Sequence, residues 1–276
     1  MLKKLKIIGI VAGVVAVLLA ILIIVAAVTI KSGLDGLTRH FNADVASYMT
    51  EYEYENGTAV EFDTVLTGFW SGWIYCENGK YSLMNEAPEQ SLKTALSDVE
   101  LLLRRGGAIN DDEYDFTAEG YEHLEEKLKL LAPINSEYLE YSVFKSGDSI
   151  YGFVNYYDEW LHSDLICSYY VNYIDGEIIL SDYSDNSVII ACNQTHCIRF
   201  ENDAYYSAGI ESSEKVELFR ETDIETMMYR SIKDGILVYG IDSIDGEWYL
   251  SLVFYSYDGS DVQILLDKEL LELKQP

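Results

Sequence analysis

The stretch DGEWYLSLVFYSYDG, residues 245–259, decides the fold, because its residue types alternate and an Asp-Gly dipeptide stands at each end. Successive side chains of a β-strand point to opposite faces of the sheet. Asp-Gly is a preferred dipeptide of two-residue hairpin turns. One set of alternate positions is predicted to lie in a core, and it contains Trp248, Leu250, Leu252 and Phe254. The other set contains Tyr249, Ser251, Val253, Tyr255 and Tyr257.

The segments on either side of this stretch extend the strand pattern. Together they predict a three-stranded antiparallel meander at residues 236–243, 247–257 and 261–266. Runs rich in Tyr, Ile, Val and Phe alternate with further Asp-Gly turns from residue 134 onward, and Ile-Asp-Gly-Glu occurs at both 174–177 and 244–247. Residues 134–276 are therefore predicted to form a mostly antiparallel β domain. A sandwich, an open barrel and partial propeller-like meanders all fit this pattern.

Residues 31–133 have a mixed pattern, so the predicted fold class is α+β. Apolar residues at helical spacing predict a juxtamembrane helix over residues 32–52. Short β-type runs then surround Asn78-Gly79, a dipeptide that strongly favours a hairpin turn.

Two consecutive helices, an αα unit, are predicted in the second half of this segment. The first should begin at Pro88 and end at Gly106-Gly107, because proline favours the start of a helix and glycine its end. The second should be capped by Thr117 and end before Pro133.

An uncharged run at residues 7–30 predicts where the protein resides. A helix of this length, at about 1.5 Å per residue, is long enough for the roughly 30 Å of a bilayer core. Residues 1–6 contain three lysines, so the positive-inside rule places the N-terminus in the cytoplasm and the rest of the chain outside. A single-pass cell-membrane protein is expected. The alternative is a signal peptide cleaved near Ala26-Ala27, although signal peptides have shorter apolar regions of about 7–15 residues.

Small residues share one face of the predicted membrane helix, and these are Gly9, Gly13, Ala16 and Ala20. The spacing of the two glycines allows close approach of two helices, so a homodimer through this face is one interpretation. The other is that Gly and Ala are simply frequent in membrane helices.

Negative charge dominates the rest of the chain. The formal net charge is −28, and residues 32–276 hold all 47 acidic residues but only 15 of the 19 basic ones. Such a surface repels nucleic acid and attracts basic proteins, basic peptides or cations. Nucleic acid is therefore not expected as a partner. Solubility alone would also explain the charge.

Four cysteines lie in a compartment that is expected to be oxidising. Residues 193–196 form a short loop between two apolar runs, so Cys192 and Cys197 should face each other across a hairpin. This makes them a candidate disulfide. Cys76 and Cys167 are expected to be separate buried thiols. A zinc site is not expected, because the spacing of Cys192 and Cys197 is too short to surround the ion.

One acidic segment resembles a calcium-binding loop, with Asp111, Glu113, Asp115 and Glu122 at loop positions 1, 3, 5 and 12. Phe116 stands at position 6, where the loop requires glycine to turn sharply. The acidic residues are better explained as the start of a helix, where they complement the helix dipole. No metal or other cofactor is expected.

Ser142-Val-Phe-Lys145, followed by Ser184-Asp185-Asn186, matches two motifs of penicillin-binding proteins and serine β-lactamases. In those enzymes the serine and lysine begin a helix, whereas residues 138–144 alternate like a strand. The third motif, Lys-Thr-Gly, does not follow. We assign no catalytic residues from the sequence.

Two aromatic groups are candidate ligand platforms, because exposed rings bind sugars and peptides. Trp70 and Trp73 flank a short Ser-Gly turn, and Tyr156-Tyr157 precede Trp160. Core packing or cross-strand pairing is the alternative explanation for these rings.

Two classes of function fit the sequence. The first is a membrane-anchored, extracytoplasmic binding or scaffold module without catalysis, whose acidic surface meets a basic partner or cation. The second is an extracytoplasmic hydrolase acting on envelope polysaccharide or peptide. The lack of a recognisable nucleophile or metal motif favours the first class.

Overall fold

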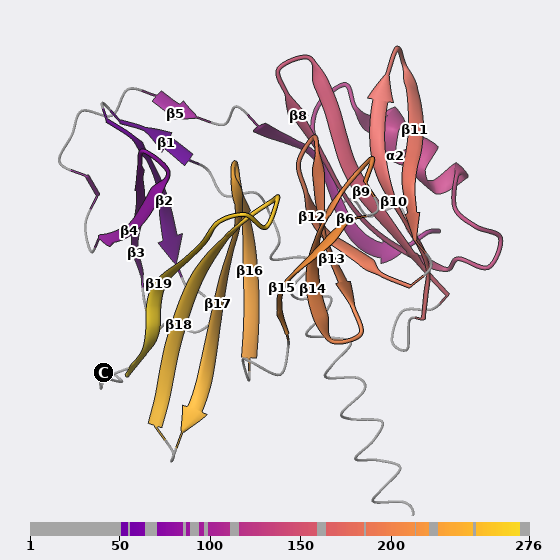
Figure 1. Cartoon of the computed structure of the whole chain (residues 1–276). Helices are drawn as coiled ribbons and strands as arrows, with labels where there is room; N and C mark the ends of the chain where they lie inside the picture. The colour runs from indigo at the N-terminus through magenta and orange to yellow at the C-terminus, as the bar shows by residue number, and fades with distance from the viewer. Residues whose placement is uncertain are drawn as a thin grey trace, which may run out of the picture.

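The computed structural model describes residues 51–54, 56–63, 71–84, 87–88, 94–96, 99–110, 116–158, 164–184, 186–212, 214–220, 226–244 and 247–270. These residues form four antiparallel sheets and one short helix (Figure 1). The prediction of a mostly antiparallel β protein is therefore confirmed.

The fourth sheet contains residues 247–256 of the stretch DGEWYLSLVFYSYDG. Its strands, in spatial order, are β16 (Thr226–Ile232), β17 (Gly235–Ile244), β18 (Glu247–Ser256) and β19 (Val262–Leu270). The predicted meander is confirmed, and β16 adds a fourth strand to it. Successive side chains of β18 pack on opposite faces of the sheet, with Leu252 and Phe254 in the core on one side and Val253 and Tyr255 in the core on the other. The side chain of Trp248 lies outside the described part of the chain.

The third sheet covers one face of the fourth. Its strands are β12 (Val188–Cys192), β13 (His196–Glu201), β14 (Ala204–Gly209) and β15 (Lys215–Arg220). The contact between the two sheets is aromatic. Tyr205 stacks on Phe219 with ring centroids 4.5 Å apart, and the Phe219 ring lies 4.8 Å from the ring of Tyr255 in β18. Such ring pairs stabilise a contact beyond the area that they bury.

The second sheet covers the other face of the third. Its strands are β6 (Val99–Ala108), β7 (Phe116–Thr117), β8 (Tyr138–Ser146), β9 (Ser149–Tyr157), β10 (Leu165–Ile174) and β11 (Glu177–Ser184), in the order β11-β10-β9-β8-β6-β7. Phe144 and Tyr151 pack toward Ile189 and Cys197 of the third sheet. The opposite face is covered by α2 (Glu122–Leu130), which packs Leu124 and Leu128 into the apolar core of that face.

The first sheet covers the remaining face of the fourth. Its strands are β1 (Glu51–Glu53), β2 (Thr58–Asp63), β3 (Ser71–Glu77), β4 (Lys80–Met84) and β5 (Thr94–Leu96), in the order β4-β3-β2-β1-β5. Tyr81 stacks on Phe254 at 4.2 Å between centroids. The side-chain amide of Gln263 accepts a hydrogen bond from the Tyr81 backbone N–H (2.8 Å) and donates one to the Gly79 carbonyl (2.7 Å). Gln263 thus takes the place of a neighbouring strand at the edge of β4.

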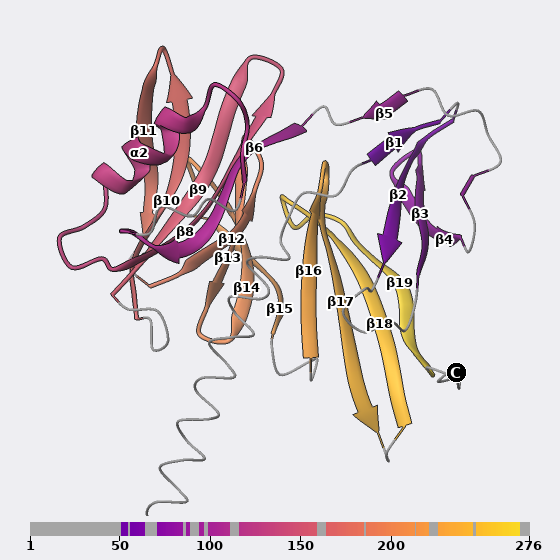
Figure 2. The same ribbon diagram turned by 180° about the vertical axis from the view of Figure 1, so that it is seen from behind.

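The four sheets stand side by side in the order first, fourth, third, second, as the two views in Figures 1 and 2 show. This order differs from the chain order. The first and second sheets are consecutive in sequence yet lie at opposite ends of the row, and the chain then returns through the third sheet to the fourth. Strand β6 pairs with β8 across residues 133/134, where the sequence predicts a domain boundary. The division of the chain into domains at this point stays a prediction.

The prediction of a helix between Pro88 and Gly106 is wrong for residues 94–96 and 99–106, which lie in β5 and β6. A β-bulge explains the misleading helical spacing. The register with β8 shifts between Leu101 and Leu103, so the adjacent Leu102 and Leu103 both enter the same core. The two glycines at the predicted helix end continue the strand.

The second predicted helix is confirmed as α2, with two differences at its ends. Leu124 and Leu128 are buried as predicted, but Leu131 is 43% exposed. Thr117 is not the cap, because it lies in β7 and Tyr121 occupies the N-cap position without a capping side chain. Tyr52, predicted as the end of the juxtamembrane helix, lies in β1; residues 32–50 of that helix lie outside the described residues.

A buried ion pair attaches α2 to the second sheet. Arg105 of β6 contacts Glu125 of α2 at 2.6 Å, and both side chains are almost completely buried. Lys129 lies 3.2 Å from the same carboxylate oxygen. Removing one member of a buried pair leaves the other charge without compensation, which costs more than the pair itself contributes.

We predict that Glu125→Ala lowers the free energy of unfolding by about 3–5 kcal/mol, because Arg105 then stays buried without its carboxylate. Denaturant unfolding of the full chain measures this change. Glu126→Ala is the matched control, since Glu126 is exposed on the same helix and its removal should change stability by less than about 0.5 kcal/mol. Equal effects of the two substitutions would refute the assigned role of the pair.

Candidate functional site

A shallow depression lies where the second, third and fourth sheets meet. Its empty volume is about 210 Å³, part of which is open to solvent. Pockets for small-molecule ligands usually enclose roughly 300–1,000 Å³. The depression is therefore too small to enclose a small-molecule ligand. Its walls are Val99, Phe144 and Tyr151 from the second sheet, Cys192 and Asn193 from the third, and Ile232, Lys233 and Tyr257 from the fourth.

The tyrosine and cysteine side chains of this depression stay protonated at neutral pH. Burial raises the pKa of the Tyr151 and Tyr257 hydroxyls above the ordinary value for tyrosine. Burial, together with the neighbouring Cys197, raises the pKa of the Cys192 thiol well above its usual range. Because the thiolate is the reactive form of cysteine, this environment does not activate Cys192 as a nucleophile.

The cysteine hairpin has the predicted register. Cys192 at the end of β12 lies directly opposite Cys197 in β13. The Asn193 N–H donates a hydrogen bond to the His196 carbonyl at 2.9 Å, so the next pair outward, the two cysteines, is a non-hydrogen-bonded pair. Cα atoms of such a pair are about 4.5 Å apart, at the short end of the range for disulfides. Both cysteines are buried and no disulfide joins them in the structure, so the disulfide stays a prediction.

We predict that refolding in oxidised glutathione joins this pair by a disulfide, because both thiols are accessible in the unfolded chain; the two thiol hydrogens pass to glutathione, which is reduced. Intact-mass measurement should show the loss of two hydrogens, and the free energy of unfolding should rise by about 2 kcal/mol, as expected for so short a loop. In Cys197→Ala, oxidation should leave the stability unchanged. A wild-type protein that keeps four alkylatable thiols after oxidation would contradict the prediction.

A buried polar network connects the second and third sheets. The Asn155 side chain of β9 donates to the Ile189 carbonyl (2.9 Å) and accepts from the Ile189 N–H (3.1 Å), as a strand neighbour would. The Ser168 hydroxyl oxygen lies 2.7 Å from the Asn155 side-chain oxygen and 2.8 Å from the Ser187 carbonyl oxygen, and its one hydrogen is donated between these two acceptors. Arg199 donates to the Ser187 hydroxyl (2.8 Å). No motif in the sequence marks these residues, because the network joins segments that only the fold brings together.

The serine and lysine of the β-lactamase-like motif do not converge. Both lie in β8, which is a strand as predicted, and an odd spacing of three residues places them on opposite faces. Ser142 is buried, whereas Lys145 is half-buried with its ammonium 3.5 Å from the Tyr121 hydroxyl. Ser184 accepts hydrogen bonds from the N–H groups of Asn186 and Ser187, which is a turn-forming role.

The predicted aromatic platforms are separated or buried where the structure describes them. Tyr156 and Tyr157 are core residues that point to opposite faces of β9. The Tyr156 hydroxyl donates to the Leu128 carbonyl (2.7 Å), and the Tyr157 hydroxyl donates to the Glu140 carboxylate (2.8 Å). Neither ring is exposed for a ligand. Trp73 is half-buried beside Tyr52, with centroids 5.6 Å apart, and Trp70 and Trp160 lie outside the described residues.

The remaining predicted sites are only partly within the described ranges. Glu122 begins α2, where hydrogen bonds from its own backbone N–H and from the Gly120 N–H (3.2 Å) lower the pKa of its carboxyl group. No group of three or more potential metal ligands gathers among the described residues. The other calcium-loop residues, Asp111, Glu113 and Asp115, and the predicted dimer face, Gly9, Gly13, Ala16 and Ala20, lie outside these ranges.

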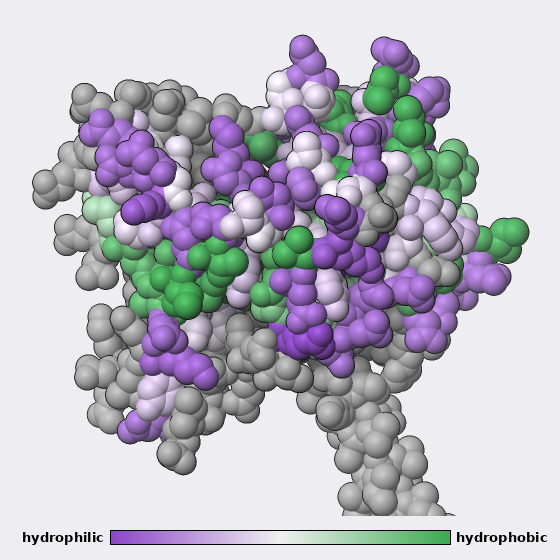
Figure 3. Space-filling view, viewed as in Figure 1, coloured by the Kyte–Doolittle hydropathy of each residue, from purple (hydrophilic) through white to green (hydrophobic). Residues whose placement is uncertain are grey.

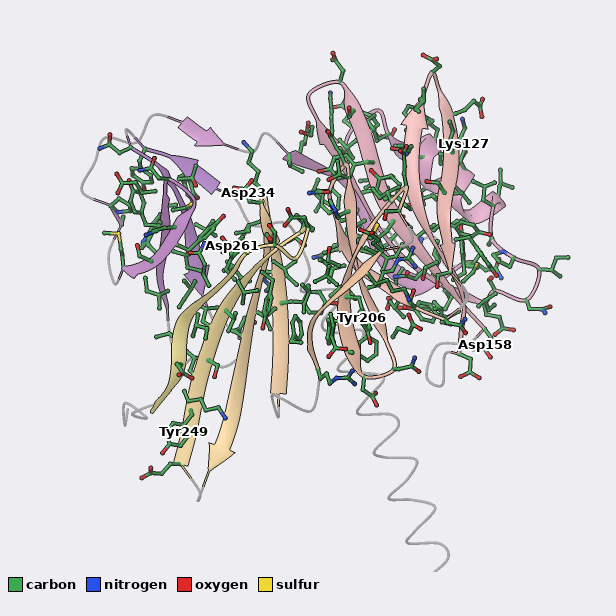
Figure 4. The ribbon with its side chains drawn as sticks, viewed as in Figure 1. Lys127, Asp158, Tyr206, Asp234, Tyr249 and Asp261 are labelled. Carbon is green, nitrogen blue, oxygen red and sulfur yellow. The ribbon has the colours of Figure 1, made fainter. Side chains whose placement is uncertain are left out.

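Many surface cations of the described residues are already paired with acidic side chains. Lys215 lies 2.5 Å from Glu201, and Arg220 lies 2.7 Å from Glu217. Exposed acidic residues gather at the turns, and Figure 4 shows Asp234 and Asp261 near one another at one end of the fourth sheet. Hydrogen bonds from Ser256 and Ser260 lower the pKa of the neighbouring Asp258 to about 2, so it remains ionised.

The chain matches no protein family model, and a comparison with curated proteins finds no significant match. Among the described residues, no helix is long and apolar enough to cross a membrane. The predicted membrane helix at residues 7–30 lies outside them.

Proposed function

We propose that the protein is a membrane-anchored, extracytoplasmic binding or scaffold module whose acidic surface meets a basic protein or peptide. Residues 7–30 would anchor it in the bilayer, with the N-terminus in the cytoplasm and the sheets outside. The charge pattern provides the main support, and the shape of the described surface agrees with it.

The observation that carries the proposal is the internal pairing of the surface cations. Lys215 and Arg220 contact acidic neighbours on or beside the third sheet, and Lys129 contacts the buried Glu125. The chain has 28 more acidic than basic residues, so even with these cations paired many carboxylates have no basic residue to neutralise them. Uncompensated charge of one sign attracts partners of the opposite sign and accelerates their association.

The surface shape favours contact with a macromolecule. The depression between the sheets is smaller than a usual ligand pocket, and its tyrosine and cysteine groups are protonated. Binding is then expected over turns and strand edges, as in many protein–protein and protein–peptide contacts.

We predict that the full chain, in detergent or nanodiscs, binds a lysine-rich peptide with an affinity that falls by at least about tenfold between low and high salt. Fluorescence anisotropy of the labelled peptide measures this dependence. A peptide of equal length with glutamine in place of lysine is the control and should not bind. Binding that is insensitive to salt, or equal for the two peptides, would contradict the proposed function.

The proposed topology has a separate test. On intact cells, an antibody should label an epitope tag placed after residue 276, whereas a tag before residue 1 should require permeabilisation, because the lysines of residues 1–6 favour the cytoplasmic side. The reverse labelling pattern would place the acidic sheets in the cytoplasm and overturn the proposed location.

A further inference from the structure

The strand β11 forms one edge of the second sheet and has a side that pairs with no described strand. It is joined to β10 by a two-residue turn in which Asp175 and Gly176 both have positive φ, of 51° and 87°. In such a hairpin the residues next to the turn are hydrogen-bonded to each other, and the pattern then alternates. The backbone groups of Glu177 and Ile179 therefore face β10, and those of Ile178 and Leu180 face away from it.

The exposed side chains of β11 are apolar as well as acidic. Ile179 is 47% exposed and Tyr183 is 59% exposed, while Ile178 and Leu180 pack toward the core under α2. Figure 3 shows green, apolar residues at its upper right, over the region where Figure 1 places the β10–β11 hairpin and α2. A long edge with unpaired backbone groups and apolar side chains is a template for another strand.

Other edge strands of the sheets carry features that block such pairing. The exposed edge of β15 has Lys215 and Arg220, and a lysine on an edge strand opposes the addition of a further strand. The edge of β4 is occupied by the side chain of Gln263. By contrast, β11 has the sequence EIILSDYS, which contains no lysine, arginine or proline.

The charges around β11 select a cationic occupant. Asp175 and Glu177 are exposed at its start. The nearby Lys127, labelled in Figure 4, donates to the Gly176 carbonyl, lies 5.8 Å from the Tyr173 ring centroid and lies 3.7 Å from the Glu177 carboxylate. This ion pair is partly exposed, so a basic segment can compete for Glu177, and Asp175 adds a second exposed negative charge. A second copy of the chain could also offer a strand, but each copy carries a net charge of −28, and like charges at close range oppose association.

We propose that β11 binds an extended, cationic segment of a partner protein as an additional antiparallel strand of the second sheet. Backbone hydrogen bonds to Ile178 and Leu180 provide the affinity, Ile179 and Tyr183 contact apolar side chains, and the acidic residues contact the cations. The inference rests on the proposed binding of a basic partner, and it names the surface and the mode of recognition.

Backbone methylation of the ligand provides the first test. The probe is an eight-residue peptide of alternating lysine and valine, which is compared with two versions that are N-methylated at alternate residues, in one register or the other. A peptide strand offers its N–H groups to each side alternately. Methylation in the register that faces β11 should weaken binding at least tenfold, and methylation in the other register should change it less than twofold.

A protein variant provides the second test. Ile179→Lys adds a positive charge to β11 at an exposed position and should weaken binding of the unmodified peptide at least tenfold. Ile264→Lys is the matched control, because Ile264 is 66% exposed in β19, and it should change binding less than twofold. Circular dichroism melting of the full chain in nanodiscs should show that both variants remain folded.

The outcomes separate this inference from the proposed function. If the peptide affinity depends on salt but is changed neither by the register of methylation nor by Ile179→Lys, the β11 site is overturned and the proposal of a basic partner remains in place. Absence of binding to any lysine-rich peptide would overturn both. A homodimer that Ile179→Lys dissociates would show that a second copy occupies β11, and would likewise overturn the inference.

Discussion

The central constraint of this fold is that β18 buries its side chains on both faces. Leu250, Leu252 and Phe254 need one apolar cover, and Val253 and Tyr255 need another. A single sheet cannot supply both, so the fourth sheet must lie between the first and the third. The third sheet in turn has a second face, which the second sheet covers, and α2 completes the far side of that sheet. The four sheets form a row because each apolar sheet face must be buried against another layer.

Aromatic side chains make this layering specific. Tyr205, Phe219 and Tyr255 fill the contact between the third and fourth sheets, and Tyr81 stacks on Phe254 between the fourth and first. Polar side chains form hydrogen bonds with backbone N–H and C=O groups at places where two sheets meet but their strands do not pair. Asn155 bonds both backbone groups of Ile189, and Gln263 bonds the edge of β4. The interior is thereby occupied on nearly every described face, which leaves turns and strand edges as the surfaces that remain for partners.

Local chemistry made part of this fold predictable. Asn78-Gly79 and Asp175-Gly176 adopt the positive φ angles that their residue types favour, and the alternation of β18 correctly indicated a core strand. The Cys192–Cys197 register was predictable because a short loop fixes it. Strand β6 was not predictable, because its bulge places adjacent leucines in one core and so imitates the spacing of a helical face. Whether these residues form a strand or a helix depends on pairing with β8, which lies about thirty or more residues further along the chain. The Arg105–Glu125 pair and the Asn155 network join segments that are 20 and 34 residues apart in sequence, so the sequence did not reveal them.

The acidic composition and the open edge of β11 have a common physical explanation. Proteins usually protect an exposed edge with lysine or proline, because an unprotected edge pairs with other chains. In the proposed site, the net charge of −28 would oppose the approach of identical copies without a lysine on the strand. The same charge would not repel a cationic segment, so the proposed edge would discriminate between a basic partner and a second copy of the chain. A lysine on β11 would oppose both, and the described strand contains none.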